Sequence, residues 1–162
     1  ASAPLPRPFP AAPMPLASVR GLVGWGEISP LWAAAPCYFP LDEMRKLRPN
    51  GKIVAVSVGA MSSIHDMACE TFAQLYGMRT DYGARHAAEC GHRRYGEDYT
   101  GRGLLQSWDA DNPIHIVGHS FGGNTALTLI SLLAQDVSAL HTLCIQSKLS
   151  NWAYSSQPML RL

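Results

Sequence analysis

Apolar residues along this chain follow two periods, one typical of strands and one typical of helices. A β-branched run predicts a buried strand over residues 52–58. An apolar run that starts at Pro113 predicts a second strand, which leads into Gly118. The run Leu-Ala-Ser-Val-Arg-Gly-Leu predicts a further short strand over residues 16–22. Apolar residues at helical spacing predict helices over residues 41–48 and 63–76.

A third helix is predicted over residues 124–134, soon after the strand that starts at Pro113, and a last strand over residues 140–145. Strands that alternate with helices predict an α/β fold, with a mostly parallel sheet and flanking helices. Residues 78–106 are rich in Gly, Tyr, Arg and His and have little periodicity, so we expect one long loop there. Loops of that length in compact domains are usually functional; the alternative is that the assignment of a loop is wrong.

Prolines alternate with small residues over residues 1–15, which predicts a disordered, poorly packed leader. The remaining residues, 16–162, are few enough for one domain. The sequence begins with alanine, so we expect a mature form or a fragment.

Composition narrows the classes of function. The chain is 47% hydrophobic with a net charge of +1, and no basic stripe is present to bind nucleic acid or a membrane surface. No apolar run reaches about 18 residues, so no transmembrane helix is expected. The four cysteines lack CxxC spacing, which favours buried free thiols over a disulfide framework and leaves the cellular compartment open.

The clearest chemical motif is Gly-His-Ser-Phe-Gly at residues 118–122, between a predicted strand and a predicted helix. This is the G-x-S-x-G pattern of a nucleophile elbow, in which a serine on a sharp strand-to-helix turn stands clear of the sheet. The glycines let the two backbones pass closely, and the free N–H groups of the helix start can stabilise an oxyanion. The motif predicts Ser120 as a nucleophile; the alternative is a glycine-rich turn with an unreactive serine.

Three longer strings extend this motif: HDMACETFAQLYG from His65, DYGARHAAECGHRRYG from Asp81, and PIHIVGHSFGG from Pro113. Together they resemble the zinc-containing thermoalkalophilic bacterial lipases and their relatives in plants and algae. The resemblance implies an α/β-hydrolase that cleaves triacylglycerols and shorter carboxylic esters. It also implies an incomplete, N-terminal part of the domain, because roughly three or four predicted strands are fewer than a hydrolase sheet needs.

The resemblance further implies a structural zinc ion held by Asp66, His86 and His92, because the family binds zinc with two aspartates and two histidines. Imidazole and carboxylate ligands suit tetrahedral zinc. Spacing alone does not indicate this site, and without the resemblance both histidines are typical of solvated loops. The family's fourth ligand, an aspartate, would lie beyond this sequence. A site with three ligands would bind the ion more weakly, or water would complete it. His65 is expected to be exposed beside Asp66.

By the same resemblance, Ser120 is the nucleophile and the backbone N–H of Phe121 is one oxyanion donor. The second donor would be the backbone N–H of Leu22, although Arg20 stands where the family has a histidine. A backbone donor does not depend on the identity of that side chain, so the role is retained in the prediction.

A serine nucleophile needs a histidine base and an orienting acid, which follow it in the chain in α/β-hydrolases. Asp136 and His141 follow Ser120 too closely to return to the strand ends beside it. His115 is predicted to be a buried, hydrogen-bonded core residue. The acid and base are therefore expected from a C-terminal half or a second chain.

The preferred interpretation is a serine esterase acting on acylglycerols or other lipid esters. Two alternatives remain open at this point. The first is a non-catalytic, zinc-stabilised remnant of a lipase that binds lipid or a partner. The second keeps the elbow serine but assigns it to an acyltransferase.

Overall fold

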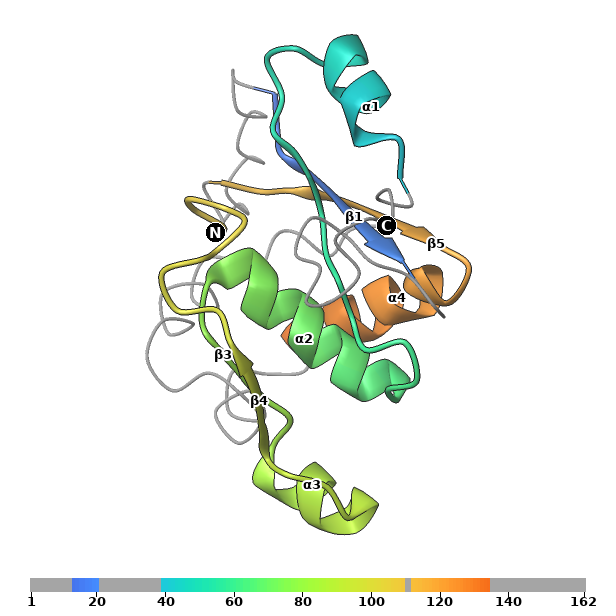
Figure 1. Ribbon diagram of the computed structural model, residues 1–162, viewed down its shortest axis with the longest axis vertical. Helices are drawn as coiled ribbons and strands as arrows, with labels where there is room; N and C mark the ends of the chain where they lie inside the picture. Colours follow the sequence, from blue (N-terminus) through green and yellow to red (C-terminus); the bar gives the residue numbers. More distant parts are fainter. Residues whose placement is uncertain (1–12, 21–38, 110–111, 135–162) are drawn as a thin grey trace, which may run out of the picture.

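The parallel sheet of this protein has three strands in the order β2-β1-β5. The computed structural model describes residues 13–20, 39–109 and 112–134 (Figure 1). The first strand, β1 (Leu16–Arg20), lies in the middle and pairs in parallel with β2 (Ile53–Ala55) and β5 (His115–His119). The predicted α/β fold with a mostly parallel sheet is confirmed, and the sheet is open rather than closed.

Helices cover both faces of this sheet. The helices α2 (Ile64–Tyr76) and α4 (Phe121–Ala134) pack on one another and on one face, below the sheet in the view of Figure 1. The short helix α1 (Leu41–Leu47) packs against β2 in a separate apolar cluster. Alternation along β2 explains this division, because Val54 lies in the larger cluster and its neighbours lie in the smaller one.

Local signals fix both ends of α2. The Ser63 hydroxyl accepts a hydrogen bond from the Asp66 N–H at 3.1 Å, as expected of an N-cap residue. Gly77 ends the helix with φ 80°, a left-handed conformation that glycine adopts without a steric penalty. Between these ends, Met67 and Leu75 are fully buried, and burial of one such side chain contributes roughly 1.5–3 kcal/mol.

The prediction of one long loop over residues 78–106 is wrong. This segment contains a strand, β3 (Arg79–Asp81), a helix, α3 (Ala84–Cys90), and a strand, β4 (Tyr95–Asp98). The two strands form a separate antiparallel pair, and α3 lies beyond them, away from the parallel sheet (Figure 1). These elements are too short to give a periodic pattern of apolar residues, and most of their residues are exposed or half-buried.

The other predicted elements are present with shifted ends. The strand predicted over residues 52–58 is shorter than expected, and the helix predicted over residues 124–134 begins earlier, at Phe121. That helix is not buried all round, because Leu127 is 64% exposed. The leader over residues 1–12 and the strand over residues 140–145 lie outside the described residues. No helix among the described residues is long and apolar enough to cross a membrane.

Candidate active site and metal centre

Ser120 occupies the turn between β5 and α4. Among the described residues it alone combines a side chain with a positive φ, at 57°, and it is exposed. A left-handed backbone costs roughly 1–2 kcal/mol for such a residue. Strained conformations of this kind persist where the surrounding structure enforces them, and they cluster at functional sites.

Gly118 is what makes this sharp turn possible. A Cβ atom added at Gly118 would lie 2.3 Å from the carbonyl oxygen of Gly122, far inside van der Waals contact. The turn is closed by a hydrogen bond from the Gly123 N–H to the Ser120 carbonyl at 3.0 Å. The backbone of β5 thus passes against the first turn of α4, as the elbow motif predicts.

Phe121 is the first residue of α4, so its backbone N–H belongs to the helix start, where N–H groups have no partner within the helix. The other predicted oxyanion donor, Leu22, lies outside the described residues, as do Asp136 and His141. His115 is exposed on β5, so the prediction that it is a buried core residue is wrong. The position of β5 explains the exposure of His115, because β5 is an outer strand of the three described strands in the sheet.

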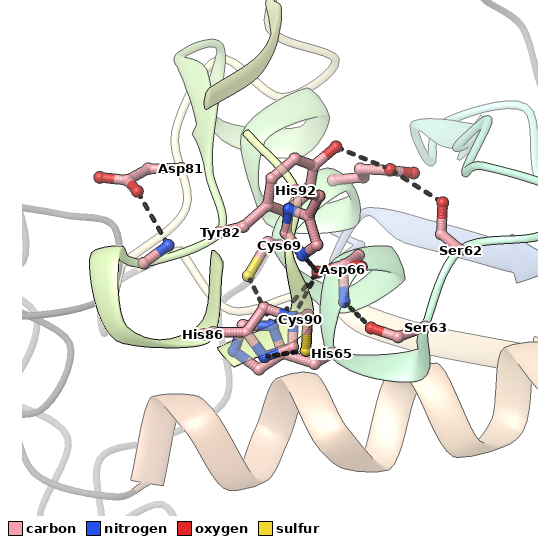
Figure 2. A network of polar contacts seen from close by, with 12 residues as sticks. Ser62, Ser63, His65, Asp66, Cys69, Asp81, Tyr82, His86, Cys90 and His92 are labelled. Atoms are coloured by element: carbon pink, nitrogen blue, oxygen red, sulfur yellow. Dashed lines mark hydrogen bonds and ion pairs between the residues drawn. The ribbon is translucent and has the colours of Figure 1, made fainter. Parts of the chain in front are cut away.

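The three predicted zinc ligands come together around one oxygen atom. The Asp66 Oδ1 atom lies 2.9 Å from His86 Nε2 and 3.7 Å from His92 Nε2 (Figure 2). Asp66 lies in the first turn of α2, His86 lies in α3, and His92 follows α3. Side chains separated in sequence therefore converge across two helices.

One hydrogen bond indicates the tautomer of His92. Its Nδ1 atom lies 2.9 Å from the carbonyl oxygen of Arg93, and a carbonyl can only accept, so Nδ1 carries the hydrogen. In the neutral ring, Nε2 then presents a lone pair towards the Asp66 carboxylate. A lone pair and a carboxylate facing one another favour a cation between them. The donor set of imidazole and carboxylate fits zinc.

His65 also belongs to this cluster, and the expectation that it is exposed is wrong. Its side chain is 21% exposed, its Nδ1 atom lies 3.5 Å from Asp66 Oδ1, and its ring stacks on that of His86 at 3.9 Å. Burial, and then the nearby His86 ring, hold the pKa of His65 below its ordinary value, although Asp66 opposes this. In the sequence, the adjacent positions of His65 and Asp66 are what indicates this contact.

Cys90 lies at the other side of the same cluster. Its Sγ atom is 3.8 Å from His86 Nδ1, which is the ring nitrogen that does not face Asp66. The thiol of Cys90 is exposed and that of Cys69 is buried, so the prediction of buried thiols holds for one of the two described cysteines. Sequence reasoning did not connect Cys90 with the histidines.

Two polar contacts hold the chain around the histidines. Arg94 forms a two-pronged ion pair with Asp81, at 2.9 and 2.8 Å, and Asp81 also accepts from the Gly83 N–H before α3 begins. The half-buried Glu70 carboxylate accepts from the Tyr82 hydroxyl at 3.0 Å. Burial raises the pKa of Glu70, and burial followed by the charge of Glu70 raises the pKa of Tyr82.

The cluster is open to solvent on one side. A groove of about 810 Å³ is lined by Asp66 and His92 together with Arg79, Tyr82 and Tyr95. An ion therefore has a path to the carboxylate from solvent.

Comparison with known proteins identifies the family. A family model described as "Lipase-like, C-terminal domain" matches residues 14–139, which include both the elbow and the histidine cluster. The chain belongs to the bacterial-type lipase family. This confirms the resemblance stated from the sequence strings.

Individual relatives agree with this assignment. Lipase 2 of Staphylococcus aureus is 38% identical over 118 residues, which are 68% of this chain, and Lipase 1 of the same species is 43% identical over 88 residues, which are 54% of it. The crystal structure of Staphylococcus hyicus lipase superposes with a TM-score of 0.66 at 32% identity, covering 79% of this chain. The structure of EstA from Clostridium botulinum also gives a TM-score of 0.66 at 32% identity, covering 78% of this chain.

The chain spans only a part of these relatives. Its match covers 16% of the length of Lipase 2, 13% of Lipase 1 and 34% of the Staphylococcus hyicus structure. The family is therefore established by residues that the chain shares with one segment of much longer proteins.

Proposed function

We propose that this chain carries the nucleophile of a carboxylic ester hydrolase of the triacylglycerol lipase type. The observation that carries the proposal is the positive φ of Ser120 in a strand-to-helix turn, with Gly118 packed against the first turn of α4. Membership of the lipase family supports the assignment of acylglycerols and related lipid esters as substrates.

In the proposed reaction, the Ser120 Oγ atom attacks the carbonyl carbon of the ester, and its proton passes to a histidine base. The tetrahedral intermediate carries an oxyanion, which the backbone N–H of Phe121 stabilises, with Leu22 N–H as a second donor. Collapse of the intermediate breaks the bond to the alcohol oxygen, which takes the proton from the histidine and leaves as the alcohol. Water, activated by the same histidine, then hydrolyses the acyl-serine. The base and its acid belong to a part of the protein beyond the described residues.

We also propose that Asp66, His86 and His92 hold a zinc ion with a structural role. The Asp66 Oδ1 atom lies within 3.7 Å of the Nε2 atom of each histidine, and the tautomer of His92 leaves a lone pair on Nε2. Bound there, zinc would supply a cross-link between the start of α2 and the segment that includes α3. Elemental analysis of the purified chain tests this, with about one zinc per chain expected.

The first experiment on the serine is labelling of the full chain with a fluorophosphonate probe, beside Ser120→Ala. Labelling of the parent chain that disappears in the variant supports an activated serine. No labelling of a chain with a cooperative melting transition would contradict a self-sufficient hydrolase. That outcome would favour the alternative of a non-catalytic, zinc-stabilised lipase relative.

A further inference from the structure

A second groove lies between the end of α1 and the start of β2. It has a volume of about 400 Å³, and its lining includes Arg45, Arg48 and Lys52. The other described residues that line it are proline, glycine or aliphatic, so no acidic side chain among them balances the three positive ones. The groove beside the histidine cluster is different, because acidic side chains line it together with arginines.

The positive residues come from one short segment. Residues 45–52 contain four of the 13 Lys and Arg residues of the chain and no Asp or Glu. Basic residues in the last turn of α1 are favourable because of the helix dipole, which accounts for Arg45 and Lys46. Lys52 lies beyond the C-cap residue Arg48, so the dipole does not account for it.

Backbone contacts hold the two arginines in place. The Arg48 Nη2 atom donates to the carbonyl oxygen of Met14 at 2.6 Å, and Arg45 Nη2 donates to that of Ile53 at 3.2 Å. A Cβ atom added at Gly51 would lie 2.6 Å from Arg48 Nε, so the Arg48 side chain lies against the backbone at Gly51. Side chains fixed in this way lose little conformational freedom when a ligand binds.

Carboxylates contribute little to balancing these charges. Arg48 is half-buried, and neither Arg48 nor Lys52 forms an ion pair with another described residue. Arg45 lies 3.7 Å from Asp42, whose side chain is 85% exposed, and exposed pairs of this kind stabilise a fold only slightly. A half-buried positive charge without a counter-charge favours the binding of an anion.

We propose that this groove binds a phosphomonoester through Arg45, Arg48 and Lys52. Three positive side chains favour an anion with two negative charges over a singly charged carboxylate. Guanidinium groups match the geometry of phosphate oxygens, and lysine adds a point charge. The volume of the groove leaves room for the group that carries the phosphate. That group is either a small soluble molecule or the glycerol of an anionic lipid.

This anion site is separate from both sites described above. The strands β1, β2 and β5 are parallel, so their amino ends share one edge of the sheet. Met14 and Ile53 lie at that edge, whereas Ser120 follows the carboxyl end of β5. The helices α1 and α3 lie at opposite ends of the molecule (Figure 1). A test of the anion site therefore depends neither on ester hydrolysis nor on the metal.

The test measures binding of inorganic phosphate to the full 162-residue chain by isothermal titration calorimetry at low salt. Lys52→Gln removes one charge from the groove. Lys46→Gln removes the same charge from the same segment, but Lys46 does not line the groove, so this variant is the matched control. We expect phosphate affinity to fall at least about 10-fold in Lys52→Gln and less than about 2-fold in Lys46→Gln.

Gly51→Ala tests the geometry of the groove without changing its charge. The added Cβ atom displaces the Arg48 side chain from its place against the backbone. We expect phosphate affinity to fall by roughly 3- to 10-fold in this variant, because the guanidinium no longer faces the ligand in a fixed position. A melting curve of each variant establishes that it is folded.

Vesicles distinguish the two sources of the phosphate. Sedimentation with phosphatidylcholine vesicles that contain phosphatidic acid, lost in Lys52→Gln and absent with pure phosphatidylcholine, assigns a lipid headgroup. Binding of inorganic phosphate and glycerol phosphate without sedimentation assigns a soluble phosphomonoester.

Three results would overturn the proposal. A folded parent chain that binds neither phosphate nor the acidic vesicles has no such site. Equal losses of affinity in Lys52→Gln and Lys46→Gln would show a general positive field rather than a specific groove. Parental affinity in Gly51→Ala would overturn the role assigned to Arg48.

Discussion

The elbow and the histidine cluster are two sites built by opposite means. The elbow is a property of the backbone, because Ser120 is positioned by a positive φ and by the close approach of Gly118 to Gly122. The histidine cluster is a property of side chains, because Asp66 Oδ1 gathers imidazole nitrogens from α2 and from the segment around α3. We therefore expect the first site to be sensitive to a single added carbon atom, and the second to the presence of an ion.

The most disruptive way to probe the elbow is Gly118→Ala. The added Cβ meets the Gly122 carbonyl at 2.3 Å, and backbone atoms must move to relieve the clash. We expect a loss of about 3 kcal/mol in the free energy of unfolding, measured by urea denaturation, and loss of serine labelling. Gly123→Ala is the matched control, because a Cβ there meets its nearest neighbour at 3.9 Å. Equal losses in both variants would contradict the backbone account.

Metal removal is the corresponding test of the histidine cluster. A ligand that binds only the folded chain stabilises it by about 2.7 kcal/mol at a free concentration 100 times its Kd. We expect a chelator to lower the Tm by roughly 5–10 °C and added zinc to restore it. Asp66→Asn should melt at the chelated Tm and ignore the chelator. An unchanged melting curve of the parent chain would count against the metal site.

The strain at Ser120 can be separated from its chemistry. Ser120→Gly relieves the left-handed backbone, whereas Ser120→Ala keeps it, and neither retains a nucleophile. We expect the glycine variant to be more stable than the alanine variant by about 1 kcal/mol in denaturant unfolding. An alanine variant as stable as the glycine variant would show that the turn is unstrained.

The smallest effect concerns Glu70, which joins the loop after β2 to the segment around the cluster. Its pKa is raised in the fold, chiefly by burial, so the folded chain binds a proton that the unfolded chain has lost. The stability of the parent chain relative to Glu70→Gln should therefore decline as pH rises from the unfolded pKa through the folded pKa, and stay low above it. Thermal melts of both chains across this range measure the difference, and parallel curves would contradict it.

The two sites also differ in how far the sequence predicts them. Neighbouring residues specify the elbow and the ends of α2, since Ser63 and Gly77 act within one helical turn. Their prediction needed only local patterns. Of the two sites, the elbow is therefore the one whose geometry the sequence alone predicts most directly.

The histidine cluster is different because its contacts cross from α2 to α3. No pattern of apolar residues marks α3, which has one buried residue, Ala87, so the segment was predicted to be a loop. Resemblance to a family supplied Asp66, His86 and His92, but the place of His65 came only from the fold. Side-chain convergence over such distances follows from tertiary packing, which local propensity does not encode.

The sheet order has a consequence for how the chain assembles. The central strand β1 comes first in the sequence, but its partner β5, which leads into Ser120, follows roughly 100 residues later. During synthesis one edge of β1 stays unpaired until β5 has been synthesised. The residues of the histidine cluster lie close together in the sequence, so they can come into contact earlier. We expect pulse-labelled hydrogen exchange during refolding to protect amides of α2 before those of β5, so that the nucleophile turn is completed last.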